Sequence, residues 1–238
     1  MRTLFSSEHE QFREQVRRFC EREIKPHYRD WEKAGHSPRE FWRKAGEHGM
    51  LCTTIPTEYG GPGGDFLHAC VVTEEMVRVG ANLGIPVHSD MVSPYLLHYG
   101  SEALKQKFLP RLCAGEIIGS IGMTEPGTGS DLKNIRTHAV RDGDDYVING
   151  QKVWITNGFN CGVVLVACKT DPAAGAKGVS LIAVEEGTPG FSRSQPMDKI
   201  GLKAQDTAEL IFENVRVPLS NRVGEEGRGF VYLMQQLP

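Results

Sequence analysis

The hydrophobic pattern of this 238-residue chain changes its period near Gly115. Before that point, apolar side chains recur every three or four residues, which is the spacing of one helix face. From there to about Val217, short apolar or alternating runs stand between turn residues, as is typical of strands. The pattern therefore predicts an α+β protein, in which an all-helical domain precedes a β-sandwich or β-barrel domain.

The helical part contains residues that commonly begin and end helices. Ser7 and Glu10 have the spacing of a capping box, so the first helix is expected to begin there. Pro26 is expected to end that helix, and Pro38 to begin a second one that stops at Gly49. Further helices are expected over 65–79 and 101–112, while glycine and proline interrupt the segments 57–65 and 80–94.

The β part contains two dipeptides that favour hairpin turns. Asp142-Gly143 and Asn149-Gly150 both suit the type I′ geometry that matches strand twist, so a turn is expected at each. After Gly227 the apolar spacing again indicates a helix. Strands are expected over 146–148, 152–155, 163–166, 179–184 and 209–217.

These changes of pattern define three expected units. The helical domain covers 1–118 and the β-domain covers 119–222. Residues 223–238 are expected to form only the start of a C-terminal helical bundle, with the rest of that bundle absent from the chain.

Charge and composition restrict the partners of the protein. A net charge of −3 gives no electrostatic reason to expect nucleic acid or an anionic membrane as a ligand. No apolar run approaches a transmembrane span, and the N-terminus shows no signal or transit segment. The six cysteines and eight histidines have no metal-ligand spacing, so no metal site is expected. Scattered thiols without a disulfide framework are typical of a reducing compartment, and we expect a soluble, cytoplasmic protein.

The segment 123–131 carries the clearest chemistry in the chain. It follows the apolar run 117–121 and contains Gly127 and Gly129, which allow a ligand to approach the backbone closely. Hydroxyl side chains and successive backbone N–H groups in such a turn form a concavity suited to a diphosphate. The alternative is an ordinary tight turn. The spacing matches neither the P-loop nor the dinucleotide-binding glycine pattern.

The same segment carries a resemblance to a known family. Met-Thr-Glu-Pro-Gly-x-Gly-Ser-Asp at 123–131, followed by Trp-Ile-Thr-Asn-Gly at 154–158, resembles the flavin-binding signature of acyl-CoA dehydrogenases. The segments 5–9, 31–35 and 201–210 are similar to the long-chain branch of that family. The resemblance covers essentially the whole chain, whereas members of the family continue well past residue 238.

The resemblance implies an FAD-dependent enzyme and a set of cofactor contacts. The Met123–Glu125 backbone would meet the pyrimidine edge of the flavin, and Gly129-Ser130 the diphosphate. The indole of Trp154 would lie beside the isoalloxazine, and the Thr156 hydroxyl would donate to flavin N5. An ordinary strand with one buried aromatic is the alternative for Trp154 and Thr156. The implied cofactor-binding residues are Ile121, Gly122, Met123, Thr124, Glu125, Gly127, Gly129, Ser130, Trp154, Ile155 and Thr156.

The resemblance also implies substrate contacts. Ser130, Ala176 and Lys177 match positions near the acyl-CoA, although a solvated loop lysine is an equal alternative for Lys177. The glutamate that removes the α-proton follows a Leu-Pro pair in the long-chain branch, and here that pair is Leu237-Pro238. No catalytic base is therefore expected within the chain, which is expected to be inactive alone.

The implied reaction is α,β-dehydrogenation of fatty acyl-CoA thioesters in β-oxidation, with electrons passed to an electron-transfer flavoprotein. An acyl-CoA oxidase, and a shortened module that binds flavin or acyl-CoA without turnover, are the alternatives. The family is usually tetrameric, so a homo-oligomer is expected.

Overall fold

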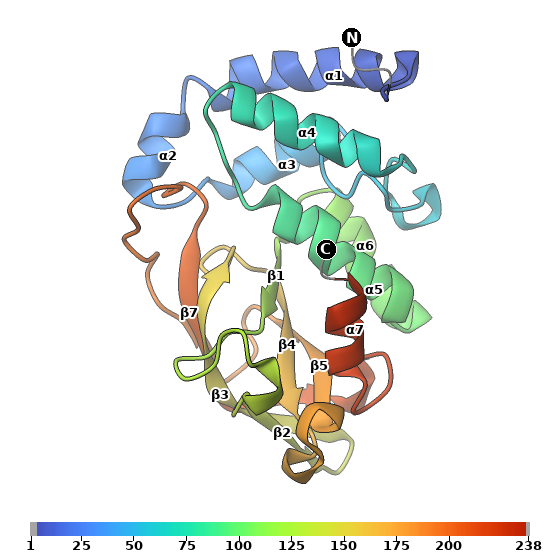
Figure 1. Cartoon of the computed structure of the whole chain (residues 1–238), viewed down its shortest axis with the longest axis vertical. Helices are drawn as coiled ribbons and strands as arrows, with labels where there is room; N and C mark the ends of the chain where they lie inside the picture. The colour runs from blue at the N-terminus through green and yellow to red at the C-terminus, as the bar shows by residue number, and fades with distance from the viewer. Residues whose placement is uncertain (1–3, 237–238) are drawn as a thin grey trace.

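The computed structural model describes residues 4–236, and Figure 1 shows their arrangement. A group of helices occupies one end of the molecule and a mixed β-sheet the other, which confirms the expected α+β architecture. A last helix, α7 (Gly229–Gln236), returns from the sheet to pack beside α5. The expected Leu237-Pro238 pair lies outside the described residues.

The helical part contains more helix than the sequence pattern predicts. The segment 80–94 is not irregular throughout, because a π-helical turn, η3, runs directly into α5. Pro86 is the N-cap of this helix and Pro94 follows the π-helical turn, so neither interrupts a regular α-helix in its middle. The helices are α1 (Ser7–Phe19), η1 (Cys20–Ile24), α2 (Tyr28–Ala34), α3 (Arg39–Glu47), η2 (Thr57–Tyr59), α4 (Phe66–Arg78), η3 (Val87–Val92), α5 (Ser93–Tyr99) and α6 (Glu102–Cys113).

The capping box of α1 lies one residue earlier than predicted. Ser6, not Ser7, is the N-cap residue, and its partner at the third helical position is His9 in place of Glu10. The Ser6 backbone is extended, whereas Ser7 is already helical, so only the Ser6 hydroxyl faces the free N–H groups of the first turn.

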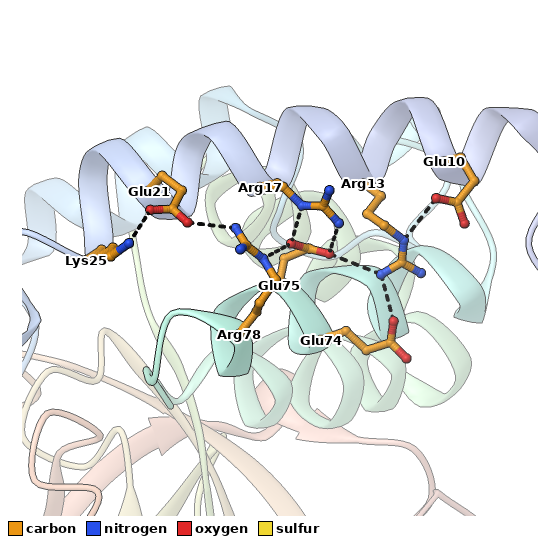
Figure 2. A network of polar contacts seen from close by, with 8 residues as sticks. All are labelled: Glu10, Arg13, Arg17, Glu21, Lys25, Glu74, Glu75 and Arg78. Carbon is orange, nitrogen blue, oxygen red and sulfur yellow. Dashed lines mark hydrogen bonds and ion pairs between the residues drawn. The ribbon is translucent and has the colours of Figure 1, made fainter. Parts of the chain in front are cut away.

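Salt bridges join α1 to α4 (Figure 2). The buried Glu75 carboxylate of α4 lies 2.9 Å from Arg17 Nε, 2.7 Å from Arg78 Nε and 3.3 Å from Arg13 Nη1. Burial raises the pKa of the Glu75 carboxyl, but hydrogen bonds from the three arginines outweigh it and lower this pKa to about 2. No helix among residues 4–236 is both long and apolar enough to cross a membrane.

The β part is one mixed sheet with the order β6-β7-β3-β2-β4-β5-β8, and β1 pairs with β4. Two pairings, β1 with β4 and β2 with β4, are parallel, and the others are antiparallel. The strands are β1 (Gly119–Gly122), β2 (His138–Asp142), β3 (Asp145–Thr156), β4 (Val163–Lys169), β5 (Val179–Glu185), β6 (Phe191–Arg193), β7 (Thr207–Pro218) and β8 (Arg222–Val223).

One of the two predicted hairpin turns is wrong. Gly143 has a φ of 63° in the turn between β2 and β3, as expected, but Asn149 and Gly150 lie inside the single long strand β3. The register with β7 shifts at this point, which marks a bulge. Gly150 is required for close packing there, because a Cβ at this position would lie 2.4 Å from Thr137 Oγ1. Gly150 therefore allows β3 to pack closely against Thr137 and does not form a turn.

Strand β4, like its neighbour β5, connects the two parts of the molecule. All of its residues are buried, and alternate side chains belong to different apolar clusters. One cluster continues into the helices, and the other is shared with β3 and β7. The residues facing the helices are Val163, Leu165 and Ala167; those facing β3 and β7 are Val164, Val166 and Cys168.

Candidate functional site

The glycine-containing turn leaves the end of β1 as a closed loop. Two hydrogen bonds join Glu125 and Thr128, with N–O distances of 2.9 and 3.0 Å. Gly127 and Gly129 are exposed, and no atom lies within 4 Å of where a Cβ of either would stand. The turn therefore presents open backbone to the surface.

A buried ion pair holds this turn in place. Lys152 Nζ lies 2.8 Å from Glu125 Oε1 and 3.0 Å from the carbonyl oxygen of Met123. The carboxylate also accepts hydrogen bonds from the backbone N–H groups of Arg136 and Thr137, at 2.6 and 2.9 Å. Burial raises the pKa of Glu125, but Lys152 and these N–H groups outweigh burial and lower it. The Glu125 side chain therefore has a structural role, because its carboxylate is hydrogen-bonded within the chain. The sequence pattern gave no indication of a role for Lys152.

The turn offers hydrogen-bond donors and few acceptors. The carbonyl oxygens of Met123, Thr124 and Glu125 accept hydrogen bonds from Lys152, Val153 and Thr128 within the chain. The backbone N–H groups of 127, 129 and 130 donate to no other residue in the range 4–236, and the hydroxyls of 124 and 130 are likewise unpaired there. A set of free donors beside open glycine backbone suits an anionic ligand.

Trp154 is turned out of β3 by a second bulge. Its φ is 59°, which is rare for a bulky residue, and the register with β7 shifts between Lys152 and Ile155. The side chain is 62% exposed, whereas its neighbours Val153 and Ile155 are buried. A strained backbone that displays a large aromatic side chain at the surface is typical of a ligand-binding position.

Thr156 ends the same strand. Its carbonyl oxygen accepts a hydrogen bond of 2.8 Å from the Ser120 hydroxyl of β1, so the strand that leads into the glycine turn is fixed against Thr156. Its hydroxyl oxygen lies 3.3 Å from Nε2 of Gln205. Thr156 is half-buried.

Asn157 and Asp206, which are not among the expected cofactor and substrate contacts, fix the end of this strand. Asn157, with a φ of 61°, donates through Nδ2 to the carbonyl oxygens of Gly84 and Gly119, at 2.9 and 3.1 Å. Asp206 is buried and accepts a hydrogen bond of 2.9 Å from the Phe159 N–H group. Desolvation raises the pKa of Asp206 to about 6. The asparagine therefore ties the helical part to β1, and the aspartate holds the turn after β3.

The remaining predicted residues lie in two places. Ile121, Gly122 and Ile155 are buried in or beside the strands β1 and β3. Ala176 and Lys177 lie in the 3₁₀ segment η5 (Pro172–Gly178), which packs against η4 (Leu132–Asn134), directly after the glycine turn. Lys177 is exposed. The structure thus brings the expected substrate residues to the side of the turn occupied by Ser130.

A pocket of 340 Å³ opens beside the turn, lined by residues 125–128, 136–138 and 149–151. Trp154 and Thr156 do not line it. The larger hollows, of 730 to 770 Å³, lie against α1, α2 and α3 and contain none of the predicted site residues.

A separate cluster brings together three possible metal ligands. His9 Nε2 and His68 Nδ1 lie 3.0 and 2.9 Å from Asp65 Oδ1. The contact with His68 belongs to the capping box of α4, whereas the contact with His9 joins α1 to the N-cap residue of α4. The N-terminus of α4 favours the negative charge of the carboxylate. Hydrogen bonds from His9 and His68 lower the pKa of Asp65 to about 2. Helix capping and the contact between α1 and α4 together explain why these three residues lie close to one another.

Family models match most of the chain. "Acyl-CoA dehydrogenase, N-terminal domain" matches residues 6–116, and "Acyl-CoA dehydrogenase, middle domain" matches residues 120–215. The long-chain specific acyl-CoA dehydrogenase of Sus scrofa mitochondria is 51% identical over 241 residues, covering 100% of this chain and 56% of that protein. The chain therefore spans little more than half of this curated relative.

Solved structures that resemble this chain also include acyl-CoA dehydrogenases. An acyl-CoA dehydrogenase from Geobacillus kaustophilus has a TM-score of 0.96 and 51% sequence identity, over 99% of this chain and 63% of that one. A glutaryl-CoA dehydrogenase from Mycobacterium smegmatis, in complex with FADH2, has a TM-score of 0.88 and 32% identity, over 96% of this chain and 58% of that one.

Proposed function

Because the chain belongs to the acyl-CoA dehydrogenase family, we propose that the protein carrying it oxidises fatty acyl-CoA thioesters between the α and β carbons, with FAD as the cofactor. Members of this family are FAD-dependent. The observation that carries the proposal is the outward-turned Trp154, two residues before Thr156 on a bulged strand and adjacent to a turn with free donors.

The residues present fit the two chemically different parts of FAD. The free N–H groups and hydroxyls of the turn match the oxygens of a diphosphate, which accept hydrogen bonds and carry negative charge. The exposed indole of Trp154 offers an apolar plane for a flat ring system. The Thr156 hydroxyl lies at the end of the same strand, where it can donate to a ring nitrogen.

The role of these residues is to bind, orient and stabilise charge. FAD bound there would supply the acceptor for the hydride that leaves the β carbon of the substrate. Thr156 supports that step by donating a hydrogen bond toward the position where negative charge arrives. Lys152 and Glu125 hold the turn rigid, so its donors are arranged before the cofactor binds.

The substrate class that we propose is a long-chain acyl-CoA. This follows from the 51% identity to the porcine long-chain enzyme and from the similarity of 201–210 to the long-chain branch. Ser130, Ala176 and Lys177 would contact the CoA portion, with the Lys177 ammonium near a phosphate. We propose that the carboxylate that removes the α-proton follows the Leu237-Pro238 pair in the whole protein.

The proposal is tested by preparing the whole protein and identifying its cofactor and substrates. We expect a yellow protein that releases FAD and not FMN on denaturation, and that reduces an artificial acceptor with saturated long-chain acyl-CoA. Release of FMN, or no turnover with acyl-CoAs of any chain length or branching, would contradict it.

Three finer properties stay predictions. We propose an electron-transfer flavoprotein as the acceptor, and rapid peroxide formation in air would identify an oxidase instead. A homotetramer is checked by light scattering of the whole protein. A cytoplasmic location is checked by cell fractionation.

A further inference from the structure

The hydroxyl group of Thr156 has one hydrogen-bond partner among residues 4–236. Gln205 Nε2 lies 3.3 Å from Thr156 Oγ1, and the two residues are 49 positions apart in the sequence. A threonine hydroxyl carries a single hydrogen and can also accept. If the oxygen accepts from Gln205, the hydrogen stays available for an acceptor on a ligand.

The backbone around Gln205 is fixed from several sides. Lys199 Nζ donates to the carbonyl oxygen of Gln205 and, at 2.8 Å, to Thr207 Oγ1. The Gln205 N–H group donates to the carbonyl oxygen of Leu202, whose φ of 52° marks a tight turn. The next residue, Asp206, accepts from the backbone N–H groups of 157 and 159. The Gln205 amide is therefore presented to Thr156 by a loop with little freedom.

We propose that Gln205 is a positioning residue for Thr156: its amide N–H donates to the threonine oxygen and thereby directs the threonine hydrogen toward the flavin. This inference rests on the proposed function. A side chain at position 205 that offered only a hydrogen-bond acceptor would accept the hydrogen of the Thr156 hydroxyl, which would then not be available to the ligand. The identity of residue 205 thus decides whether Thr156 acts as a donor.

The test compares variants of residue 205 with Thr156→Val in the whole protein. Gln205→Leu keeps the approximate size and removes the hydrogen bond, and Gln205→Glu places an acceptor at the same distance. Gln106→Leu is the matched control, because Gln106 is exposed on α6 and donates to Glu102. Three quantities are measured. Fluorescence without substrate gives the dissociation constant of FAD, and the acyl-CoA dependence of flavin reduction under argon gives the rate of reduction and the dissociation constant of acyl-CoA.

We expect Gln205→Leu to slow reduction about 5-fold, the effect of one hydrogen bond of about 1 kcal/mol. Gln205→Glu is expected to slow it by roughly 10- to 1000-fold, like Thr156→Val, because both remove the donor. Gln205→Leu and Gln205→Glu should each also weaken FAD binding by about 5-fold. The dissociation constant of acyl-CoA should change by less than about twofold, and Gln106→Leu should change none of the three quantities.

The double variant Thr156→Val/Gln205→Glu separates positioning from a general disturbance of the loop. If Gln205 acts through Thr156, the double variant behaves as Thr156→Val alone in both measurements. Additive losses, or a wild-type rate in Gln205→Glu, would overturn the inference while leaving the Thr156 role intact. An unchanged rate in Thr156→Val would instead overturn the proposed role of Thr156 itself.

Discussion

At the scale of single residues, backbone strain gathers around the candidate site. Five residues other than glycine have a positive φ among those described, and three of them, Trp154, Asn157 and Leu202, lie at or beside the site. Asparagine tolerates this conformation, whereas tryptophan and leucine do not. Strain of this kind costs on the order of 1–3 kcal/mol and persists where the surrounding structure enforces it. The bulge at Trp154 is therefore a feature that the fold maintains in order to display the indole.

Trp154→Ala should weaken FAD binding by about 5-fold, because stacking on an aromatic ring contributes on the order of 1 kcal/mol. The unfolding free energy without FAD should change by less than about 1 kcal/mol, since the side chain is exposed. Fluorescence titration and urea denaturation check these values. Val140→Ala, on the exposed face of β2, is the control. An unchanged FAD affinity would show that the indole does not contact the cofactor.

His88 makes the stability of the chain depend on pH. It is fully buried, with Nδ1 accepting from the Gly119 N–H group at 2.9 Å and Nε2 donating to the Leu112 carbonyl oxygen at 3.1 Å. Desolvation lowers the pKa of His88 to about 4. The unfolded chain, with an ordinary histidine pKa near 6.5, binds a proton first as the pH falls. The neutral His88 therefore contributes stability above about pH 6.5 that is lost toward pH 4.

Urea denaturation should show a loss of about 2 kcal/mol between pH 7.5 and pH 5.0 from this group. His88→Asn should lower the stability at pH 7.5 and show a smaller loss on acidification. An equal loss in the variant would assign the pH dependence to other groups.

At the scale of elements, salt bridges link α1 to α4 (Figure 2). The carboxylate of Glu75 is 3% exposed and is shared by arginines from both helices. An exposed pair such as Glu14 with Arg18, on α1 alone, contributes little because water screens it. The buried carboxylate is different, since its removal leaves Arg13 buried without that partner.

Glu75→Gln should lower the unfolding free energy by about 3 kcal/mol at pH 7. Glu14→Gln, the control, should change it by less than about 0.5 kcal/mol. Because the folded pKa of Glu75 lies below the unfolded value, its contribution is present above about pH 4.3 and is lost as the pH falls toward 2. Urea denaturation at pH 7 and at pH 3 measures both effects. Equal stabilities of the two variants would show that Glu75 does not stabilise the packing of α1 against α4.

At the scale of the whole molecule, the paired strands β4 and β5 join the helical and β parts. β4 contributes alternate side chains to the helical core and to the β core, so the two parts are not independent packing units. The site lies where they meet, because Asn157 bonds both to Gly84 of the helical part and to Gly119 of β1. Cofactor affinity is therefore expected to depend on the packing of both parts.

Saturated acyl-CoA should not bleach FAD that is bound to the 238-residue chain under argon. Two carboxyl groups, Asp90 and Asp206, have a pKa that desolvation raises to about 6. Asp206 is occupied by backbone N–H groups, and Asp90 lies on η3 and not on the strand of Thr156. The measurement is absorbance in the flavin band. Rapid bleaching would show a base within the chain, and Asp90→Asn and Asp206→Asn would then locate it.

Short-range patterns in the sequence determined the order of the elements and the glycine turn. The change of period at Gly115 indicated helices followed by strands, and the resemblance of 123–131 and 154–158 to a known signature indicated the family and the cofactor. These features depend on neighbours in the chain. The periods of helix and strand and the freedom of glycine are local properties, so they can be read before any tertiary contact is known.

Tertiary structure alone decided which distant residues support the site. The pairs Lys152–Glu125 and Gln205–Thr156 are separated by 27 and 49 positions, and no local pattern indicates either. The Asn149-Gly150 dipeptide has the composition of a turn, yet it continues β3 because the strand packs closely on Thr137. Such pairings follow from strand register and from the packing of β4 between two cores, which are set by the whole chain at once.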